Sequence, residues 1–227
     1  MDLSRLGWKS EQEKFEWLFI KTMFVEREYT MEKERLEKQI EFILEADKEK
    51  NIIRQTHLSG NGRRENDAEH AWHMAIMVYL LKEYANEEID AARAMMMALI
   101  HDIVEIDAGD TYAYDLKGLE TQRVREEQAA ERIFGLLPKD QEEELKGLFK
   151  EFEAGETPEA RFVRAMDNFQ PLLLNNSNDG SDWKEHGIGK TQVMKRHINT
   201  KFGSKIIWEY AEKIIEENVR KGNIKDD

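Results

Sequence analysis

The chain has 227 residues, 40% of them apolar, and a formal net charge of −13 at pH 7. The apolar share is enough for a buried core, and the length permits one large domain or two small ones. The charge argues against nonspecific binding to nucleic acid, because such binding needs Lys and Arg side chains that neutralise phosphates. The chain contains no cysteine, which excludes disulfides and leaves His, Asp and Glu as the donors for any metal.

Two further exclusions concern membranes and secretion. No apolar stretch reaches the roughly 20 residues that a membrane-spanning helix needs, and no apolar run follows the first residues as in a signal peptide. Together with the lack of cysteine, these features predict a cytoplasmic protein with no membrane partner. An acidic protein that binds a small phosphate compound needs local positive charge, from a metal and from one or two basic side chains.

The composition predicts an all-α fold. Three prolines and thirteen glycines are few for this length, whereas Glu, Lys, Leu, Met and Ala, all of which favour helices, are abundant. Taken in chain order, Leu36, Ile40 and Ile43 repeat at helical intervals and predict a first helix over about 33–47.

The next helices are predicted by their starting residues. Asp67 is a good N-cap for a second helix. Asp90 caps a third, and its middle, residues 94–100, is apolar on all sides, so we expect it at the centre of the core. Thr157 and Pro158 have the N-cap and first-turn chemistry of another helix start.

The remaining elements follow from amphipathic spacing and from polar composition. They are two surface helices over about 121–134 and 140–152, a polar loop over 175–189, and a last helix over about 204–219.

No internal repeat and no low-complexity linker divides the chain. We therefore expect one domain over residues 33–221, an N-terminal extension over 1–32 and a charged tail over 222–227. Apolar side chains such as Phe15 and Trp17 make the extension unlike a free tail. It is expected to be helical and to dock on the core or on a second subunit.

Four residues far apart in the sequence carry the side chains of a metal site. They are His70, the adjacent pair His101 and Asp102, and Asp167. Two neutral imidazoles and two carboxylates suit one divalent cation, for which Mn, Co, Mg, Fe and Ni all stay open, and they leave room for water. A water bound to such a cation becomes acidic enough to attack at neutral pH.

Acidic neighbours strengthen this interpretation. On a helix, Glu105 lies on the same face as His101, and Asp107 and Asp110 follow closely. Such a group of carboxylates repels itself unless a cation or solvent screens it. A single buried histidine is more often a hydrogen-bonded core residue than a ligand, but the whole cluster favours a metal site.

The pattern of these four residues resembles the HD superfamily of metal-dependent phosphohydrolases. The longer stretches 63–70, 99–110 and 162–167 are similar to the 5′-deoxynucleotidase branch of that superfamily, and the likeness covers about residues 33–215. It implies an all-α HD-domain helical bundle, commonly a homodimer, that holds a divalent metal at the four positions. The implied substrate is a small nucleotide, a (deoxy)nucleoside monophosphate that loses its 5′-phosphate.

The resemblance also implies roles for four other residues. Glu105 matches the group that orients or deprotonates the attacking water, and Asp110 matches the acid that protonates the leaving 5′-oxygen. Arg54 matches the arginine that binds the phosphate, for which a guanidinium is well shaped. Gln55 stands where some members of the family carry an aromatic residue that favours deoxyribose, so the choice of sugar stays open.

Two alternatives stay open beside this interpretation. One is a regulatory HD module that binds a nucleotide without turnover, and the other is a hydrolase of a different small phosphate ester. A dinuclear HD site is disfavoured, because it needs further histidines and residues 103–166 contain none. His73 is expected behind the site or in the core, and His57, His186 and His197 are given no role.

Overall fold

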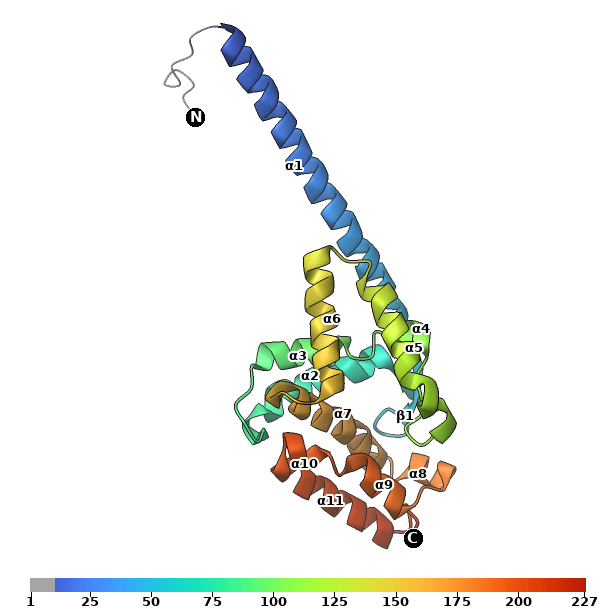
Figure 1. Ribbon diagram of the computed structural model, residues 1–227. Helices are drawn as coiled ribbons and strands as arrows, with labels where there is room; N and C mark the ends of the chain where they lie inside the picture. The colour runs from blue at the N-terminus through green and yellow to red at the C-terminus, as the bar shows by residue number, and fades with distance from the viewer. Residues whose placement is uncertain (1–10) are drawn as a thin grey trace.

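Helix α1 (Glu11–Ala46) is a single long helix that projects from the body of the molecule (Figure 1). The computed structural model describes residues 11–227, and residues 1–10 of the expected extension lie outside them. The sequence predicted a helix over about 33–47 and a helical extension before it; the two form one helix, α1, which contains neither Gly nor Pro. Phe15 and Phe19 are 70% and 59% exposed, so these side chains do not dock on the core of the same chain.

The C-terminal half of α1 joins the body through α6 (Lys139–Ala154). The Arg35 guanidinium donates to both oxygens of Asp140 at 2.7 and 2.8 Å. The Gln39 amide donates to the Gln141 side chain at 2.8 Å. These contacts fix the direction of α1 where it enters the helical bundle.

The all-α class is confirmed, with one small hairpin in addition. None of the helices in the described part of the chain is long and apolar enough to cross a membrane. After α1 the elements before α6 are η2 (Asp47–Asn51), β1 (Ile53–His57), β2 (Arg64–Asn66), α2 (Asp67–Leu81), η3 (Lys82–Tyr84), α3 (Ala91–Ile100), α4 (Glu105–Ala108) and α5 (Leu116–Phe134). After α6 come α7 (Pro158–Ser177), α8 (Ser181–His186), α9 (Lys190–His197), α10 (Thr200–Gly203) and α11 (Lys205–Arg220).

The hairpin of β1 and β2 was not predicted. Its strands run antiparallel, with Ile53 opposite Asn66 and His57 opposite Arg64. The strands lack the apolar alternation that marks a half-buried strand, because they lie beside polar side chains of the candidate site and not over the apolar core.

Capping side chains start the helices as predicted, with one correction. Asp90 and Thr157 accept hydrogen bonds from backbone amides in the first turns of α3 and α7. Asn66, and not Asp67, caps α2: its side chain accepts from the backbone of Glu69, whose carboxylate accepts from the backbone of Asn66 in return. The Asp67 side chain is therefore available for contacts elsewhere.

The apolar core lies between α2, α3, α5, α6, α7 and α11. The expectation that α3 is buried on all sides is wrong: Met97 is fully buried, but Met96 and Leu99 are 39% and 40% exposed. Trp72 of α2 is 62% exposed as well. The largest fully buried apolar side chains are Phe134, Phe162, Met74, Met97, Ile133, Met166, Leu172, Ile215 and Ile224.

The C-terminal region is more ordered than the sequence suggested. The expected polar loop over 175–189 contains the short helix α8. Within the expected charged tail, Ile224 is buried and the backbone N–H of Lys225 donates to the carbonyl of Ile188 at 3.0 Å. The buried side chain of Ile224 and this backbone hydrogen bond together hold the segment on the body.

Helix α7 contains Pro171 in its interior. Proline has no N–H, so the carbonyl of Asp167, four residues earlier, lacks the hydrogen bond that a regular helix would give it. The interruption separates the turns that carry Asp167 from the last turns, which lead towards α8.

Candidate metal centre

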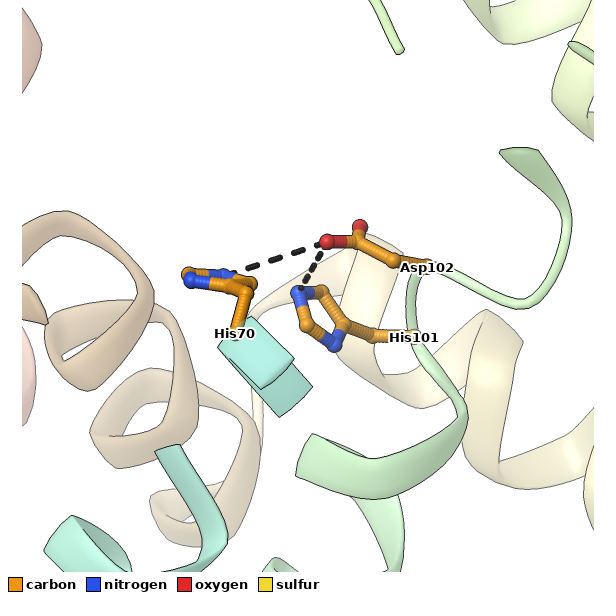
Figure 2. A group of neighbouring side chains, drawn as sticks. All are labelled: His70, His101 and Asp102. Carbon is orange, nitrogen blue, oxygen red and sulfur yellow. Dashed lines mark ion pairs between the residues drawn. The ribbon is translucent and has the colours of Figure 1, made fainter. Parts of the chain in front are cut away.

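His70, His101 and Asp102 point toward one another where α2 meets the end of α3 (Figure 2). His70 lies in the first turns of α2, and His101 directly follows the last residue of α3. Oδ2 of Asp102 lies 3.8 Å from Nε2 of His70 and 3.1 Å from Nε2 of His101. One carboxylate oxygen therefore faces two imidazole nitrogens, and the three residues form a group that could hold a metal ion.

Asp167 of α7 completes the expected set. Its Oδ1 lies 3.3 Å from Nε2 of His70 and 4.0 Å from Nε2 of His101. On its other side, Nη2 of Arg196 lies 3.4 Å from Oδ2. The structure thus brings all four residues together from three segments of the chain.

Both histidines are held at Nδ1 and present Nε2 to the carboxylates. Nδ1 of His101 lies 2.9 Å from the carbonyl of Ala98, and Nδ1 of His70 lies 3.0 Å from Oε1 of Gln170. Both oxygens only accept, so each contact favours a proton on Nδ1 of its ring. Nε2 of His101 is buried and has no aligned hydrogen-bond partner among the described residues. An orphaned nitrogen between carboxylates fits a bound cation.

The pKa shifts of the four candidate ligands are those expected of a cation site. Burial and the nearby charge of Arg54 lower the pKa of His70 to about 4. Burial also disfavours the charged form of His101, but Asp102 and Asp167 outweigh it and raise the pKa of His101 to about 9. The pKa values of these two carboxyls are held well below their ordinary range by the neighbouring positive groups, despite burial. The proton on His101 thus supplies positive charge where a cation would lie.

Metal affinity is expected to rise with pH. A ligating imidazole must be neutral, and because the pKa of His101 is about 9, a cation has to displace its proton below that pH. Affinity should therefore increase about tenfold per pH unit from about pH 6 towards 9. Calorimetric titration with Mn²⁺ in buffers of different ionisation enthalpy measures both the affinity and the released proton. A pH-independent affinity without proton release would contradict the expectation.

Arg54 of β1 lies against the same carboxylate. Its Nη1 is 2.8 Å from Oδ2 of Asp102 and 3.1 Å from Oδ1 of Asp67, and its Nε is 3.6 Å from Oε1 of Glu65. Burial opposes its charge, but the surrounding carboxylates raise the pKa of Arg54 well above its ordinary value. Arg54 therefore places a fixed positive charge beside the candidate metal ligands.

Glu105 and Asp110 line the same cavity as His101, Asp102 and Asp167. Glu105 begins α4, is 6% exposed, and its Oε2 has no hydrogen-bond partner among the residues described. Burial, and then the charges of Asp102 and Asp67, raise the pKa of Glu105 to about 12. Asp110 follows Gly109, whose φ of 75° favours glycine, and burial raises the pKa of Asp110 too.

The cavity has a volume of about 330 Å³, enough for a small polar ligand. It combines charged side chains with aromatic rings. Besides His101, Asp102 and Asp167, its lining includes Arg54, Gln55, Glu105, Asp110, Tyr112, Tyr114, Asp182, Trp183 and Arg196.

Two residues beside the candidate ligands were missed by the sequence analysis. Gln170 contacts His70, and its spacing of three residues from Asp167 on α7 would have placed both on one helix face. Arg196 contacts Asp167 from α9, a short helix that the sequence analysis did not predict.

Two other histidines have contacts that bear on the site. His73 lies behind it, with its Nδ1 3.2 Å from Nε2 of Gln170, which is one of the two positions expected. His57, which was given no role, joins β1 to α8: its Nδ1 lies 2.6 Å from Oδ1 of Asp182.

The family model of the HD domain matches residues 46–208, a span that includes all four candidate ligands. The chain belongs to the HD domain family. A crystal structure described as a predicted metal-dependent phosphohydrolase from Magnetospirillum magnetotacticum MS-1 is similar to this HD domain protein, with a TM-score of 0.80 and 48% identity. The likeness covers 84% of this chain and 95% of that one.

Two curated relatives of this HD domain protein are both named 5′-deoxynucleotidase. The human 5′-deoxynucleotidase HDDC2 is 32% identical over 132 residues, which cover 57% of this chain and 61% of that protein. The 5′-deoxynucleotidase hdd1 of Schizosaccharomyces pombe is 32% identical over 117 residues, 50% of this chain and 58% of that protein. The chain thus spans about six tenths of the length of these relatives. The protein PH0347 of Pyrococcus horikoshii, 21% identical with a TM-score of 0.55, shares the fold.

Proposed function

We propose that this HD domain protein is a divalent-metal-dependent phosphomonoesterase that converts nucleoside 5′-monophosphates, deoxynucleotides included, to nucleoside and phosphate. The observation that carries the proposal is the contact of Arg54 with Asp102, which itself faces the two imidazoles. A cation site and a guanidinium side by side form a phosphate site within an acidic chain. The name shared by the curated relatives supports the nucleotide class.

The residues divide the reaction between them. A divalent cation held by His70, His101, Asp102 and Asp167 would polarise the phosphoryl oxygens and lower the pKa of water. Arg54 donates hydrogen bonds to the phosphoryl oxygens as charge builds on them.

Proton transfer is assigned to the two carboxyls that line the cavity. With the charges of Asp102 and Asp67 offset by a bound cation, Glu105, four residues after His101, would take the proton of the water whose oxygen attacks phosphorus. The bond from phosphorus to the 5′-oxygen then breaks. Asp110, whose pKa is raised by burial, gives its proton to that oxygen, so the nucleoside leaves as a neutral alcohol.

Gln55 bears on the choice of sugar. It lines the cavity next to Arg54 in the chain, and its amide can donate to or accept from a ribose hydroxyl. We therefore expect ribonucleotides to be accepted beside deoxyribonucleotides.

A substrate panel tests the proposal. Phosphate release is measured from ribo- and deoxyribonucleoside 5′-monophosphates on metal-stripped protein, with Mg²⁺, Mn²⁺ or Co²⁺ added back. Metal-dependent release from monophosphates is the expected result, and the ratio of deoxy to ribo substrates reports on Gln55. Tight stoichiometric metal binding without release from any nucleotide would favour a regulatory nucleotide-binding module or another phosphate ester as substrate.

We also infer a homodimer. Trp72 and Leu80 on α2 are each 62% exposed, and Met96 and Leu99 on the neighbouring α3 are partly exposed. Apolar side chains that remain exposed on adjacent helices are typical of an interface between subunits. Sedimentation velocity over a range of concentrations tests this, and a monomer throughout would contradict it. The cytoplasmic location expected from the sequence stays a prediction.

A further inference from the structure

Gln170 lies directly behind His70 in a dry part of the molecule. Its Oε1 is 3.0 Å from Nδ1 of His70, and its Nε2 donates to Oε2 of Glu65 at 2.9 Å. The same nitrogen lies 3.2 Å from Nδ1 of His73. His70 and Gln170 are 0% exposed and Glu65 is 1% exposed. The side-chain amide is therefore fully used by protein partners.

The direction of these hydrogen bonds favours one of the two ring nitrogens of His70, Nδ1, as the site of its proton. A carboxyl oxygen of Glu65 accepts from the amide nitrogen of Gln170, which turns the amide oxygen towards His70. That oxygen only accepts, so this contact favours the proton on Nδ1 of His70 and a free lone pair on Nε2, whereas Oδ1 of Asp167, 3.3 Å from Nε2, favours the reverse. The lone pair points to the side of Asp102 and Asp167. An amide turned the other way would favour the opposite tautomer, which cannot bind a cation through Nε2.

We propose that Gln170, held in place by Glu65, is a positioning residue that selects the metal-binding tautomer of His70. The inference rests on the proposed metal-dependent function. Glu65 reaches the substrate side of the site as well, because its Oε1 lies 3.6 Å from Nε of Arg54. One buried carboxyl thus braces both a candidate metal ligand and the candidate phosphate-binding arginine.

The first test replaces the amide with an apolar side chain of similar shape. Gln170→Met removes the acceptor for His70 while it conserves volume. The dissociation constant for Mn²⁺, measured by calorimetry, is expected to rise about 10- to 100-fold, as for other partners of metal-ligating histidines.

A matched control separates this effect from the general loss of a buried amide. Asn218 of α11 is also 0% exposed, and its amide donates to Asn176 and to the carbonyl of Ile214. It contacts none of the candidate ligands. Asn218→Leu is expected to lower the melting temperature and to leave the dissociation constant for Mn²⁺ unchanged.

A double exchange tests the direction of the hydrogen bonds. Glu65→Gln combined with Gln170→Glu keeps the total charge and an acceptor towards His70, and it reverses donor and acceptor between positions 65 and 170. The double variant is expected to bind Mn²⁺ with nearly the wild-type affinity. A general packing defect would not be repaired by this exchange. If Gln170→Met does not fold, the double exchange still decides, because a loss of affinity as large as 10- to 100-fold in this variant would overturn the proposal.

The ring nitrogens of His70 give a readout that does not depend on metal or turnover. Nitrogen-15 NMR of the metal-free protein is expected to show the proton on Nδ1 in the wild type and a mixture of tautomers in Gln170→Met. A folded Gln170→Met variant with wild-type tautomer and affinity overturns the role of Gln170. A wild type that binds no cation contradicts the proposed function instead, while the tautomer comparison still tests Gln170.

Discussion

Replacing Asp102 with alanine is expected to abolish both metal binding and hydrolysis. Its Oδ2 is the oxygen that faces Nε2 of His70 and of His101, at 3.8 and 3.1 Å. Without it, two imidazoles and Asp167 remain, and the shared donor at the centre is lost. His101→Ala should have the same outcome, because it removes the nitrogen that is buried without an aligned partner. Metal content after gel filtration and phosphate release are the two measurements.

The matching control is an acidic residue far from the cavity. Asp140 is exposed and pairs with Arg35 on α1, so Asp140→Asn should keep both metal and activity. The Asp102→Ala protein should remain folded, since Arg54 keeps its contacts with Asp67 and Glu65, and circular dichroism checks this. Full metal occupancy in Asp102→Ala would remove this residue from the candidate ligands.

Glu105→Gln is expected to keep the metal and to lower kcat by about 10²- to 10⁴-fold, the usual contribution of a positioned general base. The amide has the shape of the carboxyl but cannot take a proton from water. Glu105→Ala should behave likewise. Bound metal together with near-normal turnover would refute the role of Glu105.

The same substitution should stabilise the metal-free protein. Burial raises the pKa of Glu105 from its ordinary value of 4.5 to about 12. At a pH between these values the unfolded chain releases a proton that the folded chain retains, so stability declines as the pH rises through this range. The glutamine variant has no such proton. At pH 7 its metal-free form should therefore melt at a higher temperature than the metal-free wild type, as measured by differential scanning calorimetry.

The candidate ligands could be predicted from the sequence because they lie in short stretches of characteristic residue types. The all-α class was predictable for a similar reason, since it follows from composition and apolar spacing. Gln170 and Arg196 were not found, because neither belongs to a motif and only the packing of α7 and α9 brings them to the site. The roles of Glu105 and Asp110 stay predictions until they are measured.

Apolar spacing was a poor guide to which side chains are buried. It identified α2 and α3 correctly as helices, yet Trp72, Met96 and Leu99 are substantially exposed within one chain. A helix face that packs on a second subunit has the same apolar period as one that packs in the core. The N-terminal extension was expected to be helical, but its continuity with the helix over 33–47 as the single helix α1 was not predicted.

Pro171 makes α7 easier to bend at the turn between Asp167 and Asn175, where the helix lines the cavity. The missing hydrogen bond to the carbonyl of Asp167 makes this turn the easiest one in the helix to bend. The turns before it hold Asp167 and Gln170, whereas the turns after it carry Asn175 and continue to Trp183, which both line the cavity. A bend at this turn would move Asn175 relative to Asp167 and so change the width of the cavity between them.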